Sequence, residues 1–310
     1  MKILVTGASG FTGMAMVQYL VSQGEQEVYG LVNTRPQDIV EKSGLKFVKG
    51  NLLNRQRLQE IIHEIRPGCI IHCAGLNKGT LDELLVTNAV GTQNLLDSVH
   101  TEDIGCRTVV VSSSAVYGYT GTSPIKETAP LHPRSAYGIS KAAQELVTLR
   151  DYIINKSQVT LARPFNLVGP GQPSSFVCGE IVSQIARIEA GKQTALNLLE
   201  LVSKRDFIDV RDAVRAYWAL AAHPKFNRQC AGKTFNIGSG KAYAIPDIIQ
   251  ILEEFMGRSY KISLPDTSPP IAILSQKSNN DHIQRITKWL PEISLDTSLK
   301  DMLIHERKQT

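Results

Sequence analysis

Two tyrosines in the sequence are each followed four residues later by a lysine: Tyr137 with Lys141, and Tyr152 with Lys156. Residues four apart share one face of a helix, so the ammonium of such a pair lies beside the phenol. The positive charge favours the phenolate and lowers the tyrosine pKa, which suits general acid or base catalysis. The spacing therefore predicts a proton-transfer group, and position along the chain has to decide between the two pairs.

The serine run at residues 112–114 favours the first pair. It ends an apolar, strand-like segment, and in open α/β sheets ligands bind outside the carboxyl ends of the strands. A hydroxyl there can hydrogen-bond the oxygen of a reacting carbon. Tyr137 begins a predicted helix, whereas Tyr152 lies near its far end, about 22 Å away. We therefore predict that Tyr137 serves the site, over the alternative of an unrelated polar loop and a plain helical pair.

A glycine-rich turn follows the first strand-like segment, residues 2–6, and leads into a predicted helix. Glycines allow the backbone to approach a pyrophosphate closely, and the phosphate charge is attracted to free N–H groups at the helix N-terminus. The alternative is a tight turn that only packs the helix against the strand, but the position of the turn favours binding. The residues predicted to contact a dinucleotide here are Gly7, Gly10, Phe11, Thr12 and Gly13.

The end of the second strand indicates which dinucleotide is bound. NAD-binding chains carry a carboxylate there for the ribose hydroxyl, but this chain has Asn33, followed by Thr34 and Arg35. Without a carboxylate to repel a 2′-phosphate, and with a guanidinium to attract it, NADP is favoured over NAD. The alternative is that Arg35 is a solvated loop cation. Further residues predicted to line the cofactor site follow the third and fourth strands: Asn51, Leu52, Ala74 and Gly75.

Strands and helices alternate along the first half of the chain, and the strands are continuously apolar, which is typical of a parallel sheet covered on both faces. We predict an α/β fold with a doubly wound Rossmann sheet in residues 1–165 and a smaller α/β substrate domain in 166–310, partly interleaved with it. The predicted strands are 2–6, 27–32, 46–48, 69–73, 107–112 and 158–162, and the predicted helices include 55–66, 81–99 and 137–155.

The composition is that of an ordinary globular chain. Of its 310 residues, 42% are hydrophobic and 20% are charged, which excludes collagen, coiled coils and intrinsic disorder. Apolar runs are too short to span a bilayer, and no secretory signal precedes the first strand, so we expect a cytoplasmic protein. A net charge of +5 without basic blocks suits small anionic ligands and disfavours nucleic acid.

The five cysteines lie mostly in apolar runs, which is typical of reduced core thiols rather than of a disulfide framework. Cys69 and Cys73 flank His72, but no second pair with the spacing of a zinc site follows. We therefore predict no metal site.

Taken in order and spacing, five motifs resemble the extended short-chain dehydrogenase/reductases that act on nucleotide sugars. They are the glycine turn, SSSAVYG at 112–118, the Tyr137 and Lys141 pair, RPFN at 163–166 and RDFIDVRD at 205–212. The resemblance covers almost the whole chain. It implies that Ser113 is the catalytic hydroxyl and that Tyr137 and Lys141 complete the triad beside the nicotinamide ribose.

The resemblance also implies the substrate site and the partners. Asn166 and Arg205 would hold the diphosphate or nucleotide, for which an amide and a guanidinium are chemically suited. Ser113, Ser114 and Tyr137 would contact the sugar. By analogy with the family, helices 81–99 and 137–155 would pair with a second subunit, giving a homodimer with a four-helix interface.

Dehydratases of this family carry an acidic pair directly after the catalytic hydroxyl, because eliminating water needs its own acid and base. Ser114 and Ala115 stand there in this chain, so dehydration is disfavoured. The segments 169–172 and 205–220 resemble the GDP-4-keto-6-deoxymannose reductases, and we predict NADPH-dependent reduction of a nucleoside-diphosphate 4-keto-6-deoxy-hexose. Two alternatives stay open: a nucleotide-sugar 4-epimerase with tightly bound NAD, and a non-catalytic protein that senses the cofactor.

Overall fold

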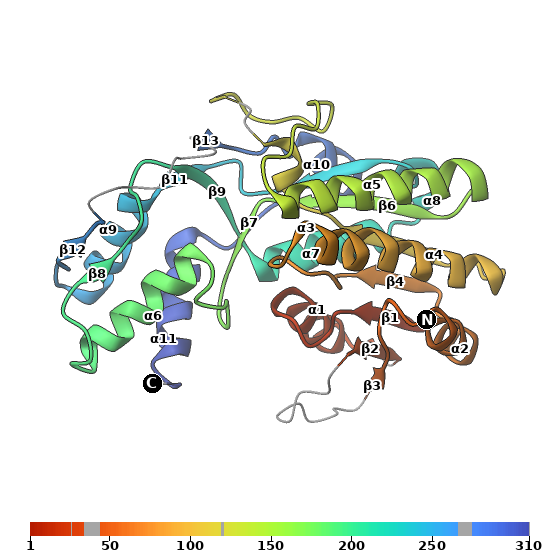
Figure 1. Cartoon of the computed structure of the whole chain (residues 1–310), viewed down its shortest axis with the longest axis horizontal. Helices are drawn as coiled ribbons and strands as arrows, with labels where there is room; N and C mark the ends of the chain where they lie inside the picture. The colour runs from red at the N-terminus through yellow and green to blue at the C-terminus, as the bar shows by residue number, and fades with distance from the viewer. Residues whose placement is uncertain (26, 34–43, 119–120, 266–274, 310) are drawn as a thin grey trace.

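The computed structural model describes residues 1–25, 27–33, 44–118, 121–265 and 275–309. They form two lobes (Figure 1). The larger lobe is built on a seven-stranded sheet. The smaller lobe packs three helices around a second hydrophobic core: α6 (Val177–Glu189), α9 (Ile245–Met256) and α11 (Leu295–Glu306).

All seven strands of the large sheet are parallel, in the order β10-β6-β5-β4-β1-β2-β3. The central strands are fully buried and rich in Val, Ile and Leu, because helices cover both faces of the sheet. The predicted doubly wound parallel sheet is confirmed. Its strands are β1 (Ile3–Thr6), β2 (Val28–Val32), β3 (Leu45–Lys49), β4 (Cys69–His72), β5 (Arg107–Val111), β6 (Val159–Pro164) and β10 (Thr234–Ile237).

The helices divide between the two faces of this sheet. On one face α1 (Phe11–Ser22) packs against α7 (Val210–Ala221), with α8 (Phe226–Gln229) and α10 (Asp281–Thr287) in the same core. On the other face lie α2 (Arg55–Ile65), α4 (Gly91–Thr101) and α5 (Ala136–Asn155). Because β10 and α7 come from the second half of the chain, the chain crosses between the lobes more than once.

A small sheet joins the two lobes. Its central strand, β9 (Lys204–Asp209), lies between β11 (Ala242–Ala244) and β13 (Ser275–Gln276), and it also pairs with β7 (Asn166–Val168). In Figure 1 β7 and β9 bridge the gap between the lobes. A separate two-stranded ladder joins β8 (Leu196–Asn197) to β12 (Ile262–Ser263).

The predicted helix 81–99 is a continuous helical run with a change of geometry in its middle. It comprises α3 (Leu81–Leu85), the π-helical segment η1 (Val86–Val90) and α4. A capping box between Thr80 and Glu83 starts it. The wider π turn places Asn88 in the interior, and such turns are frequent at functional sites.

In the described part of the chain, none of the helices combines the length and the apolar character needed to cross a bilayer. The five cysteines are free thiols, of which four are buried and Cys73 is partly buried. Burial raises the pKa of the Cys73 thiol to about 12, so it is protonated at neutral pH.

Tight packing explains two of the glycines in the first turn. Gly7 has a φ of +68°, which favours glycine, and a Cβ added to it would lie 2.7 Å from the Ala74 Cα atom. A Cβ on Gly13 would lie 2.1 Å from the Gly7 carbonyl oxygen. Gly10 differs, because its added Cβ would come no closer than 3.4 Å to any of the described neighbours.

We expect Gly13→Ala to lower the free energy of unfolding by about 1–3 kcal/mol, since extra volume in a packed position forces the backbone apart. Gly105→Ala is the matched control, because an added Cβ there would come no closer than 3.9 Å to the described neighbours, and it should change the free energy by no more than about 0.5 kcal/mol. Urea denaturation followed by circular dichroism measures both. Equal losses in the two variants would contradict the packing argument.

Candidate active site

The N-terminus of α1 is open to an anion. Gly10 is the N-cap in an extended conformation, no side chain caps the helix, and the first turn has no acidic residue. The helical hydrogen bonds begin with the Met14 amide, which donates to the Gly10 carbonyl at 2.8 Å. The preceding amides of Phe11, Thr12 and Gly13 are therefore left outside the helical ladder. This geometry, with Gly10 exposed beside it, fits the pyrophosphate of a dinucleotide.

A buried histidine holds the ends of β1 and β4 together beneath this turn. The Thr6 hydroxyl is hydrogen-bonded to His72 Nδ1 at 2.7 Å and accepts a hydrogen bond from the Ala74 amide at 3.1 Å. The other ring nitrogen of His72 contacts Thr92 Oγ1 at 2.9 Å. Burial and the nearby Lys141 ammonium lower the pKa of His72 to about 3, so the ring is neutral. The backbone at Ala74 is thus fixed against the glycine turn.

The structure places the other predicted cofactor residues at the same edge of the sheet, with different surroundings. Asn33 is exposed directly after β2, whereas Thr34 and Arg35 lie outside the described residues. The Asn51 side-chain carbonyl accepts a hydrogen bond from the Leu53 amide at 2.9 Å and so stabilises its own turn. Leu52 is buried and packs against Gly91, whereas Gly75 is exposed after β4.

Ser113, Tyr137 and Lys141 come together just beyond the carboxyl end of β5. Ser113 is the N-cap of the short 3-10 helix η2 (Ser114–Tyr117), and Tyr137 lies in the first turn of α5, which Ser135 caps. The Ser113 hydroxyl lies close enough to the Tyr137 phenol to influence its pKa. The Lys141 ammonium is buried and donates to the Val111 carbonyl at 2.6 Å.

Burial dominates the electrostatics of these groups. It raises the pKa of Tyr137, and the nearby Ser113 hydroxyl opposes this increase only in part. This shift is opposite in direction to the decrease expected from the tyrosine–lysine spacing, because removing the phenol from water disfavours the phenolate. Burial also lowers the pKa of Lys141 to about 8, and the nearby Glu145 carboxylate opposes that decrease.

The second tyrosine–lysine pair lies away from this site. Tyr152 is partly buried against the main core. Lys156 ends α5 in a left-handed conformation, and its ammonium donates to the Ile153 carbonyl at 2.9 Å. Its charge therefore stabilises the end of the helix.

Asn88, which the sequence analysis did not single out, ties the cofactor side of the site to α5. Its side-chain oxygen accepts from the Leu76 amide at 2.7 Å, and its amide nitrogen donates to the Leu76 carbonyl and to Ser140 Oγ, both at 2.9 Å. Ser140 Oγ in turn donates to the Tyr137 carbonyl at 2.8 Å. A buried asparagine within an apolar helical stretch is the signal that could have identified it.

The two predicted phosphate-binding residues lie on neighbouring strands, β7 and β9. The Asn166 amide donates to the Asp206 carbonyl at 3.0 Å. Arg205 is partly buried, and its guanidinium has one hydrogen bond, to the carbonyl of Lys204 at 3.0 Å, among the described contacts. Asp206 anchors this strand, because its buried carboxylate accepts hydrogen bonds from Ser239, Gly240 and Ser278.

Gln276 connects the substrate side to the serine run. Its buried side chain donates to the Ser114 carbonyl at 3.0 Å and accepts from Ser114 Oγ at 3.2 Å. On β13 it pairs in register with Arg205. The hydroxyl and the carbonyl oxygen of Ser114 are thus both hydrogen-bonded to Gln276. Nothing in the sequence around Gln276 indicates this contact.

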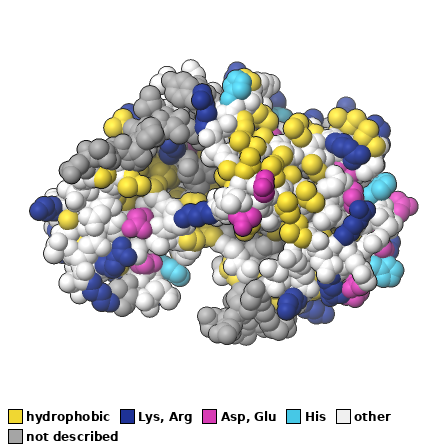
Figure 2. All heavy atoms as spheres, in the orientation of Figure 1, with side chains coloured by type: hydrophobic (Ala, Val, Ile, Leu, Met, Phe, Trp, Pro, Cys, Tyr) yellow, Lys and Arg dark blue, Asp and Glu magenta, His cyan; other side chains and the backbone are white. Residues whose placement is uncertain are grey.

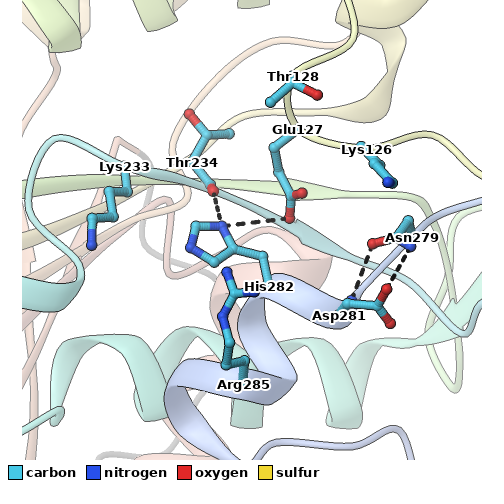
Figure 3. A pocket seen from close by; sticks show the side chains of 9 residues that line it. All are labelled: Lys126, Glu127, Thr128, Lys233, Thr234, Asn279, Asp281, His282 and Arg285. Carbon is cyan, nitrogen blue, oxygen red and sulfur yellow. Dashed lines mark hydrogen bonds and ion pairs between the residues drawn. The ribbon is translucent and has the colours of Figure 1, made fainter.

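A pocket of 510 Å³ lies elsewhere, along the edge strand β10 (Figure 3). Its charged side chains are mixed in sign, and His282 Nδ1 lies 3.9 Å from the Glu127 carboxylate. None of the residues predicted for catalysis, cofactor or substrate lines it. Its lining residues are Lys126, Glu127, Thr128, Lys233, Thr234, Asn279, Asp281, His282 and Arg285.

A doubly wound sheet with an uncapped glycine turn and with a serine, a tyrosine and a lysine converging at the carboxyl edge defines the class of short-chain dinucleotide-dependent enzymes. Comparison with known families agrees with this class. The chain belongs to the NAD dependent epimerase/dehydratase family, whose sequence model matches residues 3–238. The family resemblance and the NAD(P)-dependent enzyme class predicted from the sequence are confirmed.

Individual relatives cover the chain almost completely. The GDP-6-deoxy-D-mannose reductase of Pseudomonas aeruginosa is 30% identical over 97% of this chain and 96% of its own length. The UDP-glucose 4-epimerase of Mycoplasma genitalium is 26% identical over 99% of this chain and 95% of its own length. Among solved structures, RMD from Pseudomonas aeruginosa complexed with NADPH matches with a TM-score of 0.85 and 28% identity, covering 100% of both chains.

We expect Gln276→Met to lower the free energy of unfolding by about 1–3 kcal/mol, because it leaves the buried Ser114 hydroxyl and carbonyl without partners. Gln250→Met, at an exposed position on α9, is the matched control and should stay within about 0.5 kcal/mol. Hydrogen exchange should also be faster at the amides of η2 in the first variant alone. Unchanged stability and hydrogen exchange in Gln276→Met would show that the hydrogen bonds from Gln276 do not hold Ser114 in place.

Proposed function

We propose that the protein catalyses the NADPH-dependent reduction of a nucleoside-diphosphate 4-keto-6-deoxy-hexose to the 6-deoxy-hexose. The observation that carries this proposal is the convergence of Ser113, Tyr137 and Lys141 at the carboxyl edge of the sheet. The P. aeruginosa reductase, similar along nearly the whole chain, supports the choice of substrate class.

The roles of the three side chains follow from their chemistry. Tyr137 is the general acid, because burial keeps its phenol protonated until the sugar O4 atom develops negative charge. Ser113 holds that oxygen with its hydroxyl. The Lys141 ammonium stabilises the phenolate that remains after proton transfer. When bound, the nicotinamide cofactor supplies the hydride for sugar C4.

The glycine turn would hold the cofactor, with the amides of Phe11, Thr12 and Gly13 directed to its pyrophosphate. NADP is the preferred dinucleotide in this proposal, since Asn33 offers no carboxylate to the adenosine ribose. NAD would bind more weakly. In this scheme residues 1–165 bind the dinucleotide and 166–310 bind the nucleotide sugar. Two elements of the second range belong to the first lobe: β10 completes its sheet, and α7 covers one face of that sheet.

The substrate diphosphate would lie between Asn166 and Arg205. In the described part of the chain the Arg205 guanidinium makes one hydrogen bond, so its other N–H groups can donate to an anion. Ser114, the residue after the proposed catalytic serine, is not acidic, and its side chain is hydrogen-bonded to Gln276. This arrangement supports proton transfer at a single oxygen rather than elimination of water.

A nucleotide-sugar 4-epimerase is the second candidate, because epimerisation uses the same three side chains and the M. genitalium epimerase aligns over almost the whole chain. The two reactions differ in their demand for cofactor. A reductase consumes external NADPH, whereas an epimerase recycles a dinucleotide that stays bound.

We also propose that the protein is a homodimer. Helix α5 buries a polar face, including Ser140, Lys141, Gln144 and Glu145, and exposes apolar side chains. Figure 2 shows these apolar side chains gathered over α5 and the neighbouring α3–η1 run. A second copy of the chain would cover this surface by pairing the same two helices across a twofold axis. Its exposed apolar residues are Leu81, Val86, Val90, Ile139, Leu146, Ile153 and Ile154.

The reaction is tested with NADPH and a panel of GDP-, CDP-, UDP- and dTDP-4-keto-6-deoxy-hexoses, following absorbance at the nicotinamide band and identifying products by NMR. We expect Tyr137→Phe to reduce kcat by about 10²–10⁴-fold, since it removes the general acid. NADPH affinity, measured by fluorescence, should change little. Tyr152→Phe is the matched control and should retain full turnover.

Other outcomes would identify the competing functions. NAD that survives dialysis, with sugar interconversion in the absence of added cofactor, would replace reduction by epimerisation. NADPH binding without turnover of any sugar in the panel would leave a cofactor-sensing protein. Full activity of Tyr137→Phe would remove the assigned acid.

The dimer is tested by the molar mass in solution. We expect the wild type to have twice the chain mass of 34.1 kDa and Leu146→Glu to be a monomer, because the variant places a charge in the apolar surface. Leu146 is 64% exposed, and Leu199, 68% exposed on the smaller lobe, provides the control Leu199→Glu. Light scattering after size exclusion measures all three. A monomeric wild type would refute the assembly.

A further inference from the structure

Beneath the catalytic serine turn lies a buried ion pair that the proposed reaction does not use. Arg163 binds the Glu145 carboxylate through two nitrogens, Nε at 2.8 Å and Nη2 at 2.6 Å. Ser112 Oγ donates to the same carboxylate at 2.5 Å. Glu145 is 1% exposed and Arg163 is 5% exposed, so solvent hardly screens the interaction.

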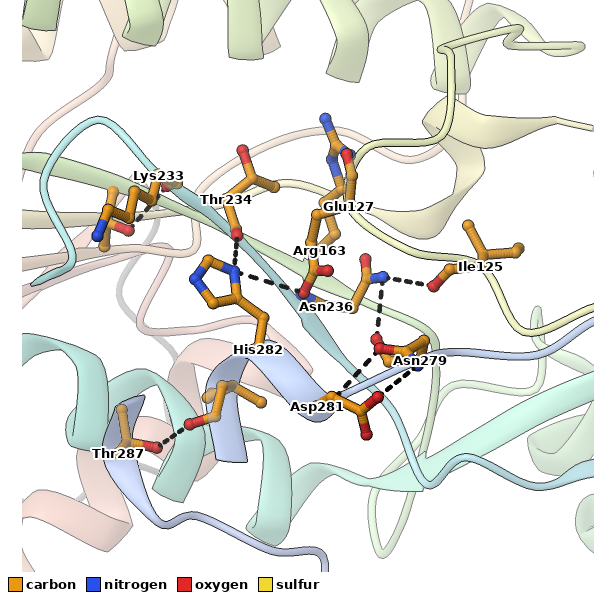
Figure 4. Close-up of polar contacts among 12 residues, drawn as sticks. Ile125, Glu127, Arg163, Lys233, Thr234, Asn236, Asn279, Asp281, His282 and Thr287 are labelled. Carbon is orange, nitrogen blue, oxygen red and sulfur yellow. Dashed lines mark hydrogen bonds and ion pairs between the residues drawn. The ribbon is translucent and has the colours of Figure 1, made fainter. Parts of the chain in front are cut away.

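The Arg163 guanidinium is held firmly from its other side. Its Nη1 atom donates to the Tyr117 hydroxyl at 2.7 Å and to the Glu127 carbonyl at 3.3 Å. The Tyr117 hydroxyl in turn donates to Asn236 Oδ1 at 2.7 Å. Figure 4 shows Arg163 beside Glu127 and Asn236. The arginine is therefore an anchored group rather than a mobile counterion.

Glu145 stands four residues after Lys141 on α5, a spacing at which a lysine and a glutamate lie on the same helix face and can form an ion pair. Here they do not: the Lys141 ammonium donates to the Val111 carbonyl, and the Glu145 carboxylate is bound by Arg163 and Ser112. Within the described residues, Arg163 is the basic side chain in ion-pair contact with Glu145. The Arg163 guanidinium thus binds the Glu145 carboxylate in place of the Lys141 ammonium.

This division of charge matters for Tyr137. The buried cluster holds two cations, Lys141 and Arg163, and one carboxylate, so one positive charge remains. The other titratable groups facing Lys141 add none, because His72 is neutral and Cys73 is a protonated thiol. An ammonium that was fully paired with Glu145 would lose most of its attraction for a phenolate.

We propose that Arg163 and Glu145 are positioning residues that act through Lys141. Arg163 holds the Glu145 carboxylate out of an ion pair with Lys141, and the carboxylate at that distance balances the buried ammonium enough to keep it charged. The positive charge of Lys141 is thereby kept for the Tyr137 hydroxyl. The same carboxylate fixes Ser112, the residue before Ser113. This proposal rests on the triad chemistry proposed above.

The two residues should affect the ammonium in opposite directions. Glu145→Gln removes the carboxylate, so burial acts unopposed and Lys141 should lose its proton at lower pH. Arg163→Met releases the carboxylate to pair with Lys141, so Lys141 should lose its proton at higher pH. An ion pair without electrostatic influence on Lys141 would destabilise both variants and leave the Lys141 titration where it is in the wild type.

The test is a titration of Lys141 by NMR, using protein labelled with ¹³C at the lysine Cε atoms and assigning the signal from Lys141→Met. We expect midpoint shifts larger than about 0.5 pH unit, downward in Glu145→Gln and upward in Arg163→Met. Ser112→Ala, which keeps both charges, is the matched control and should titrate as the wild type. No sugar is needed, so an inactive wild type would overturn the proposed reaction and leave this measurement intact.

Folding is checked by circular dichroism before each titration, because leaving one buried charge unpaired is costly. Should either single variant unfold, the double variant Glu145→Gln/Arg163→Met removes both charges together, and its Lys141 midpoint should again lie below that of the wild type. Glu145→Asp keeps the carboxylate, so its Lys141 midpoint should equal that of the wild type. This result, together with a lower midpoint in Glu145→Gln, would support an electrostatic role. A Lys141 midpoint equal to the wild type in the folded variants would overturn the proposal.

Discussion

Parallel strands end at one edge of a sheet, and in this protein that constraint brings the loops after β1, β4 and β5 together. The approach is close: a side chain on Gly7 would collide with the backbone of Ala74. The neutral His72 ring is hydrogen-bonded to the Thr6 hydroxyl, which in turn accepts a hydrogen bond from the Ala74 amide. These strand ends cannot separate without breaking buried hydrogen bonds, so the glycine turn and the segments that follow β4 and β5 are held at one edge of the sheet.

The helix that carries Tyr137 has an unusual distribution of side chains. Its buried face is polar and includes Lys141 and Glu145, while apolar residues such as Leu146 are exposed. Polar groups removed from water need partners, and the structure supplies them from β5, β6 and the π segment. The buried side of α5, which carries the residues that we propose for catalysis, is therefore held by hydrogen bonds, and its outer side is left for a second chain in the assembly that we propose.

The smaller lobe is connected to the catalytic edge by polar contacts over long distances in the sequence. Gln276 binds Ser114 across 162 residues and pairs with Arg205 on β9. Asp206, the next residue on β9, collects hydrogen bonds from two further loops. The position of Arg205 relative to the serine run is consequently defined by these contacts, which gives a physical basis for the alignment of the anionic substrate that we propose.

The sequence by itself determined the parallel α/β fold and the glycine turn at the start of α1, and it predicts a role for Tyr137 rather than for Tyr152, since these features depend on local periodicity and on the order of strands and helices. Only the tertiary structure decided which partners the buried charges take. The spacing of Lys141 and Glu145 favours an ion pair, yet Arg163 from β6 binds the carboxylate instead. Spacing also favours a lower Tyr137 pKa, whereas burial raises it. Local spacing encodes neighbours along a helix, but desolvation and contacts such as that of Gln276 with Ser114 arise only when distant segments pack together.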